Sequence, residues 1–85
     1  MGMYYVYILY SAKKDKYYVG QSEDIVNRVA SHNSGISPYT SRTDDWELVY
    51  KEEYLTRSEA IRRENGIKKK KSRKYIQWLI HQEKT

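Results

Sequence analysis

The sequence predicts a small sandwich of the α/β or α+β class, in which a β-sheet packs against helices. Residues 5–9 and 18–20 are rich in tyrosine and β-branched residues, a composition typical of strands. Further along the chain, apolar residues recur at helical spacing on either side of one more strand-like segment. With 85 residues, the chain has room for one domain and one modest core. Layers of strands and helices around that core are the compact arrangement for this size.

The composition excludes several classes of protein. Hydrophobic residues make up 39% and charged residues 32%, which suits a folded domain better than a disordered or membrane-spanning chain. Cysteine is absent, which excludes disulfides and thiolate metal sites, and two distant histidines do not favour a structural zinc site. The start of the chain lacks the layout of a signal peptide. We therefore expect a cytoplasmic setting and no membrane partner.

The first two strands are expected to form a hairpin. They are joined by the polar residues 11–16, a length suited to a hairpin loop with its flanking residues. The chain contains ten tyrosines and no phenylalanine, although phenylalanine would fill a core without a hydroxyl that needs a partner. Most of these tyrosines are interpreted as amphipathic residues at the surface or edge of the sheet.

A helix is expected next, from an N-cap at Ser22 to about Asn33, with Gly35 as its terminator. Its apolar stripe consists of Ile25, Val26, Val29 and Ala30.

Two polar residues, Arg28 and His32, lie four positions apart and fall just off one edge of this stripe. They are expected at the boundary between core and solvent, where a cleft would lie. The alternatives are a surface ion pair for Arg28 and an ordinary helix-flank position for His32.

A loop and a third strand are expected after this helix. Gly35 and Pro38 mark residues 34–45 as a loop, and residues 46–54 carry bulky side chains typical of a strand. Thr56 and Glu59 have the spacing of a capping box and predict the start of a second helix.

The second helix contains an acidic residue, Glu64, in the middle of its apolar stripe. That stripe is formed by Ala60, Ile61 and Ile67. A carboxylate there must be paired, protonated or bound to a metal, because an unpaired buried charge is costly. Salt bridges to Lys68, one turn later, or to Arg28 across the domain are the alternatives to a metal.

Positive charge is concentrated at the end of the second helix and just after it. The net charge is +5, and residues 62–74 contain eight Lys and Arg against one Glu. Such a basic cluster is the electrostatic footprint of a polyanion binder, and its alternative is a solvated helix face. The basic cluster lacks the adjoining broad apolar face that a membrane-surface helix has. We expect phosphate contacts from Lys68, Lys69, Lys70, Lys71, Arg73 and Lys74.

A last helix is expected after a bend at residues 69–73, with Ser72 as its cap. Its apolar residues repeat at helical spacing and are expected to pack on the sheet: Tyr75, Ile76, Leu79 and Ile80.

Two short motifs, Tyr-Val-Tyr at residues 5–7 and Tyr-Val-Gly at residues 18–20, resemble the halves of the GIY-YIG signature. Tyr5 stands where the first motif usually has glycine. Arg28, His32 and residues 39–40, 46–50 and 59–68 follow at suitable intervals. Their order resembles the GIY-YIG nuclease domain over nearly the whole chain, and above all its small stand-alone bacterial members. The resemblance implies one domain, residues 1–85, with a three-stranded antiparallel sheet and about three flanking helices.

The same resemblance implies an endonuclease that hydrolyses phosphodiester bonds in DNA, in repair or processing, with one Mg²⁺ or Mn²⁺ ion. It places the metal ligand at Glu64, and it matches Arg28, whose permanent forked cation suits a phosphate in the transition state. Tyr7 corresponds to the family's candidate base, and Tyr18 to the residue that positions water or phosphate. His32 has the more suitable intrinsic pKa for a base, about 6.5, so the choice between Tyr7 and His32 stays open.

The expected substrate is DNA, and the charge pattern does not distinguish RNA from it. The sequence has no base-reading motif, which predicts weak specificity through backbone or shape. Residues 39–42 resemble the family's segment beside the cleft, where Arg42 is a further candidate for phosphate contact. Two other functions are considered: a non-catalytic nucleic-acid-binding module that uses the basic cluster, and an adaptor that binds a protein through the last helix.

Overall fold

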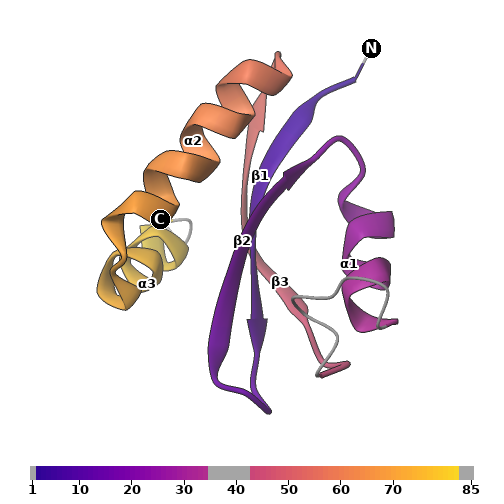
Figure 1. The fold of residues 1–85 in the computed structure, drawn as a ribbon, viewed down its shortest axis with the longest axis vertical. Helices are drawn as coiled ribbons and strands as arrows, with labels where there is room; N and C mark the ends of the chain where they lie inside the picture. The colour runs from indigo at the N-terminus through magenta and orange to yellow at the C-terminus, as the bar shows by residue number, and fades with distance from the viewer. Residues whose placement is uncertain (1, 35–42, 83–85) are drawn as a thin grey trace.

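The computed structural model describes residues 2–34 and 43–82, and these ranges contain three strands and three helices (Figure 1). The sheet consists of β1 (Tyr4–Ser11), β2 (Lys16–Ser22) and β3 (Glu47–Tyr54). The helices are α1 (Ile25–Asn33), α2 (Arg57–Lys70) and α3 (Arg73–Gln82). The α/β sandwich and the order of its elements are confirmed.

The sheet is antiparallel throughout, with the strand order β2-β1-β3. The central strand β1 is covered on both faces, so the side chains of residues 6–9 are all fully buried. Successive side chains of a strand point to opposite faces. Val6 and Ile8 therefore pack with α2 and α3, while Tyr7 and Leu9 pack with residues of α1.

Helices α2 and α3 cover one face of the sheet and α1 covers the other (Figure 1). Each face carries its own hydrophobic cluster. The larger cluster lies under α2 and α3 and is formed by Val6, Ile8, Val19, Ala60, Ile67 and Leu79. The smaller cluster, with Tyr7, Leu9 and Trp46 at its centre, packs against Ile25 and Val29 of α1. Of the two faces, the one covered by α1 contains Tyr7 and Tyr18.

Helix α1 begins later than the sequence predicts, because its N-cap is Asp24 rather than Ser22. The carboxylate of Asp24 accepts a hydrogen bond from the backbone N–H of Asn27 at 3.1 Å. Ser22 is still part of β2, where it pairs with Tyr5, so the chain cannot turn into a helix at that point.

Three residues assigned to apolar stripes are exposed. Val26 is 79% exposed on α1, where Ala30 is exposed as well, and Ile61 is 38% exposed on α2. Helix α1 is rotated about its axis relative to the prediction, because its buried side includes the polar His32. On α2, Ala60 and Ile67 are buried as predicted, and Glu64 lies half-buried between them.

The predicted caps of the last two helices are confirmed. The Thr56 hydroxyl accepts the N–H of Glu59 at 3.2 Å, and the Ser72 hydroxyl accepts the N–H of Tyr75 at 3.1 Å. Between these helices, Lys71 adopts a left-handed conformation with φ 48° and ends α2. This residue makes the corner that turns the chain from α2 into α3.

A polar network joins β3 to α2. The guanidinium of Arg63 donates to both carboxylate oxygens of Glu52, at 2.9 and 3.0 Å. The hydroxyls of Tyr50 and Tyr54 donate to the same carboxylate, and burial together with Glu52 raises the pKa of Tyr54 to about 12. Arg63 therefore stabilises the fold, although it lies within the basic cluster.

Of the helices in the described ranges, none has the length and apolar character needed to cross a bilayer.

Candidate active site

The site is built around a contact between the central strand and helix α1. The hydroxyl oxygen of Tyr7 lies 3.1 Å from Nε2 of His32, and both side chains are fully buried. His32, expected at the boundary of the core, instead lies within it. Tyr7 reaches it because odd-numbered residues of β1 face α1.

Tyr18 of β2 joins this pair and completes an aromatic cluster. Its ring centroid lies 4.7 Å from that of His32 and 6.4 Å from that of Tyr7, and its ring meets Trp46 edge to face. Three of the five residues expected at the site are thus in one cluster.

Gly20 provides the space that Tyr7 needs. The two residues face each other in the β1–β2 register, and a Cβ on Gly20 would lie 2.6 Å from the Tyr7 hydroxyl oxygen. The sequence analysis included Gly20 in a motif but did not assign it to the site. A cross-strand register counted from the hairpin turn would have indicated its role.

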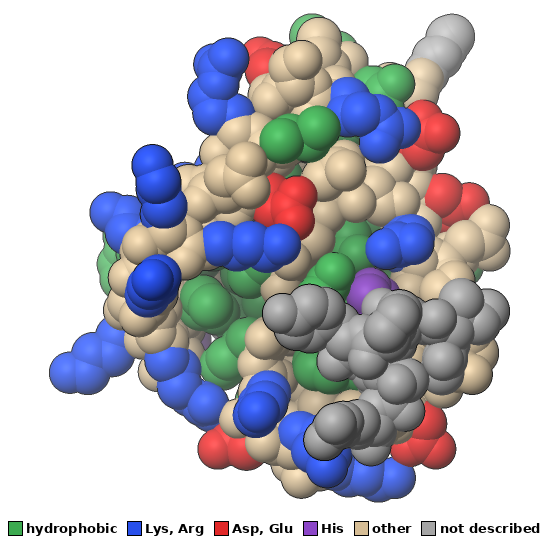
Figure 2. All heavy atoms as spheres, in the orientation of Figure 1, with side chains coloured by type: hydrophobic (Ala, Val, Ile, Leu, Met, Phe, Trp, Pro, Cys, Tyr) green, Lys and Arg blue, Asp and Glu red, His purple; other side chains and the backbone are tan. Residues whose placement is uncertain are grey.

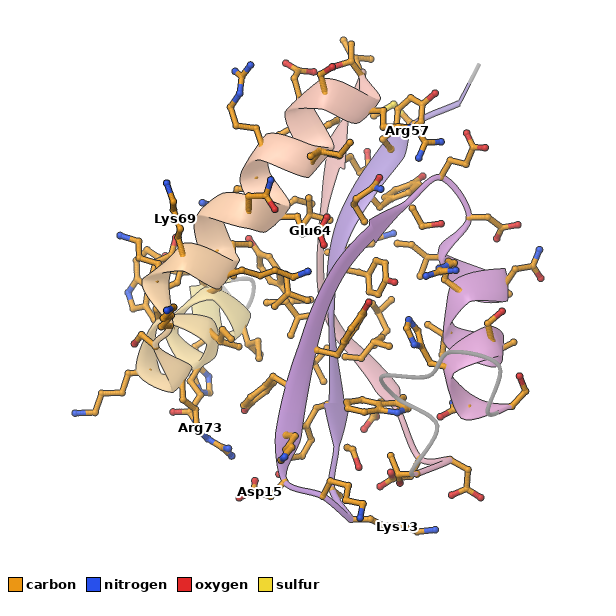
Figure 3. The ribbon with its side chains drawn as sticks, in the orientation of Figure 1. Lys13, Asp15, Arg57, Glu64, Lys69 and Arg73 are labelled. Carbon is orange, nitrogen blue, oxygen red and sulfur yellow. The ribbon has the colours of Figure 1, made fainter. Side chains whose placement is uncertain are left out.

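Arg28 and Glu64 act on the same phenol from two other elements. Burial raises the pKa of Tyr7, the guanidinium of Arg28 opposes this effect, and the negative charge of Glu64 adds to it. Arg28 is exposed on α1, while the Glu64 side chain is 16% exposed and points from α2 toward the sheet (Figure 3). Five residues from four elements therefore share one neighbourhood.

His32 is neutral near pH 7, because burial and the positive charge of Arg28 both lower its pKa. In the tautomer that carries its proton on Nδ1, the neutral ring has a free lone pair on Nε2 that can accept a hydrogen bond from the Tyr7 hydroxyl.

Glu64 is paired with Lys68, one of the two ion pairs weighed for it. The Lys68 ammonium lies 2.7 Å from a carboxylate oxygen of Glu64 and 6.0 Å from the centre of the Tyr18 ring. Among the described residues, Glu64 forms no ion pair with Arg28.

The comparisons with known proteins identify the family of this chain. A model of the GIY-YIG catalytic domain matches residues 3–76. The chain belongs to the GIY-YIG family. Similar proteins are UPF0213 proteins of Staphylococcus saprophyticus, 39% identical over 80% of this chain and 83% of the relative, of Staphylococcus epidermidis, 41% identical over the same shares, and of Listeria monocytogenes, 31% identical over 96% and 92%. No solved structure matches significantly.

Membership of the GIY-YIG family confirms the resemblance to small bacterial members of a nuclease family. In the described ranges, no group of three or more His, Asp or Glu side chains could hold a metal ion together. The single carboxylate of Glu64 fits a hard cation that takes its remaining ligands from water and phosphate.

The basic residues of this GIY-YIG domain differ in their surroundings. Lys68 and Arg73 contact the carboxylates of Glu64 and Asp15, at 2.7 and 2.5 Å. Lys69 points away from the sheet (Figure 3). The candidate Arg42, like the whole of residues 39–42, lies outside the described residues.

Substitution of Gly20 tests the packing around Tyr7. Gly20→Ala should lower the free energy of unfolding by about 1–3 kcal/mol, because the new methyl group overlaps the fully buried Tyr7 ring and forces it or the backbone to shift. Urea denaturation measures the effect. The control is Gly66→Ala on α2, where no atom lies within 4 Å of the new Cβ and stability should rise by up to ~1 kcal/mol. Equal effects at the two glycines would contradict the close contact.

The buried His32 predicts a pH-dependent stability. Its pKa is lower in the folded protein, so the unfolded chain binds a proton first as the pH falls. The contribution of His32 should be complete above ~pH 7 and should decline as the pH falls through about 6.5. His32→Gln keeps a polar side chain without this titration and should flatten the decline in urea midpoint between ~pH 7 and 5. The same slope in both proteins would refute the assignment.

Proposed function

We propose that this protein is a metal-dependent endonuclease that hydrolyses phosphodiester bonds in DNA. The observation that supports the proposal is the set of residues that surround the Tyr7 phenol. They come from three other elements and are Tyr18, Arg28, His32 and Glu64. Family membership supports a nuclease and leaves the substrate and the metal ion to experiment.

In this proposal, Arg28 of α1 binds the reacting phosphate directly, and Glu64 of α2 binds it through a metal ion. Arg28 is exposed, and its forked cation can meet the negative charge that develops on the phosphate. Glu64 would hold Mg²⁺ or Mn²⁺, whose chemistry when bound is to polarise the phosphoryl oxygen and stabilise the leaving oxygen. The carboxylate becomes available when Lys68 moves from its present contact.

The general base in this proposal is the Tyr7–His32 pair rather than either residue alone. Burial makes a free Tyr7 phenolate unfavourable, but His32 is neutral and can accept the Tyr7 proton at Nε2. The Tyr7 oxygen then takes the proton of the attacking water as it gives up its own. Tyr18, whose ring lies against His32, positions the water or the phosphate. Because Tyr7 is fully buried, water reaches it only when a covering side chain moves.

The remaining parts of the proposal concern the substrate. The basic cluster, together with Arg42, contacts the phosphates of DNA, and RNA satisfies the same charge pattern. Contacts to the backbone alone give weak sequence specificity. The proposed setting is DNA repair or processing in the cytoplasm.

Cleavage of branched, duplex and single-stranded DNA with Mg²⁺ or Mn²⁺ tests the proposed activity. Glu64→Gln and Arg28→Ala should each lower the cleavage rate by roughly 10²–10³, because each removes a charge placed to stabilise the transition state. Glu47→Gln, an exposed carboxylate at the start of β3, is the matched control. Binding without cutting under either metal would contradict the proposal and favour the non-catalytic nucleic-acid-binding module.

The pairing of Lys68 with Glu64 predicts competition with a metal. Lys68→Met keeps an unbranched side chain of nearly the same length and removes the charge, so Mn²⁺ should bind about two- to tenfold more tightly. Electron paramagnetic resonance of free Mn²⁺ measures the affinity without any cleavage. Glu64→Gln should abolish binding at this site, and an unchanged affinity in Lys68→Met would show that the two cations do not compete.

A further inference from the structure

A hollow of about 560 Å³ lies beside the candidate active site, along β2 and the corner between α2 and α3. We call it the β2-edge hollow. Strand β2 is an outer strand of the sheet, so the hollow lies at the margin of the sheet rather than within its core. Its volume falls in the range of about 300–1,000 Å³ that is usual for ligand pockets.

The floor of the β2-edge hollow is apolar. Ile67 of α2 and Ile76 of α3 line it, together with Tyr17 and Val19 of β2. Figure 2 shows hydrophobic side chains in a depression between α2 and the sheet, with Lys and Arg side chains around it. Such a floor can accept the flat face of an aromatic ligand.

The rim of the hollow is positive. Its lining includes Lys16, Lys68, Lys71 and Arg73 and no acidic residue. Lys68 and Arg73 are partly neutralised by Glu64 and Asp15. Lys16 and Lys71 form no ion pair with any residue in the described ranges, so their charges are available to an anion.

The hollow is continuous with the candidate active site through two shared residues. Lys68 lines the hollow and contacts Glu64, and Tyr18 lines the hollow and lies against His32. A ligand in the hollow would therefore be next to the residues proposed to act on the phosphate.

We propose that the β2-edge hollow binds an unpaired nucleotide of a polynucleotide strand, next to the phosphodiester bond that is cleaved. The base lies on the apolar floor, and the flanking phosphates contact Lys16 and Lys71. Bases in a duplex are stacked on both faces, whereas an unpaired base can give a face to an apolar or aromatic platform. The inference rests on the proposed function and makes it more specific, because the substrate must have an unpaired segment.

Binding in EDTA, where no cleavage occurs, tests the inference by fluorescence anisotropy. The probes are a labelled oligothymidylate, a blunt hairpin duplex with the same number of phosphates, and an oligouridylate. The hollow variant is Lys16→Gln/Lys71→Asn, since asparagine tolerates the left-handed backbone of position 71. The control variant, Lys13→Gln/Lys14→Gln, removes the same two charges from the β1–β2 turn. Thermal melting verifies that both variants are folded.

The native protein should bind oligothymidylate or oligouridylate at least ~10-fold more tightly than the duplex, and the tighter of the two identifies the strand. The hollow variant should lose about 10-fold in affinity. The slope of its log affinity against log salt concentration should flatten by about 1.4, the value for two phosphate contacts on a single strand. The control variant should keep the affinity of the native protein within about twofold and should have nearly the same salt slope. Equal binding of duplex and single strand, or equal losses in the two variants, would overturn the inference.

Cleavage of the same probes with Mg²⁺ or Mn²⁺ separates this inference from the proposed function. Single-strand binding through Lys16 and Lys71 without any cleavage would contradict the proposed nuclease activity and support the hollow as a binding site. Cleavage of the duplex as fast as the single strand would support the proposed nuclease activity and overturn the inference about the hollow.

Discussion

The contact between Tyr7 and His32 is the constraint on which the rest of the site depends. It joins the central strand to α1 through two fully buried polar groups, which are costly to bury unless they are paired with each other. The Tyr7 side chain fits where it does because Gly20 has no side chain. The Tyr18 ring packs against His32. The two motifs of the hairpin are therefore two parts of one packing arrangement.

The hydroxyl groups explain why the chain uses tyrosine where phenylalanine would also fill space. Tyr7 is paired with His32, Tyr50 and Tyr54 donate to Glu52, and Tyr10 donates to Asp15. The network at Glu52 lies on the face covered by α2, while the Tyr7 pair lies on the face covered by α1. Similar side chains thus stabilise the fold on one face and form the candidate site on the other.

The basic cluster is not a uniform surface. Arg63 is part of the link between α2 and β3, Lys68 is paired with Glu64, and Arg73 joins α3 to the hairpin turn at Asp15. Only part of the positive charge is left for a nucleic acid. The left-handed Lys71 turns α2 into α3, and at this corner Lys71 lines the β2-edge hollow together with Lys16 of β2.

The sequence by itself determined the order of the elements, the hairpin and the caps at Thr56 and Ser72, because these depend on side-chain periodicity and local hydrogen bonds. Its motifs also indicated the family. Only the tertiary structure decided that His32 is buried, that Glu64 is paired with Lys68, and which cations border a hollow. Those outcomes depend on how each helix is rotated against the sheet, and packing between distant segments sets that rotation.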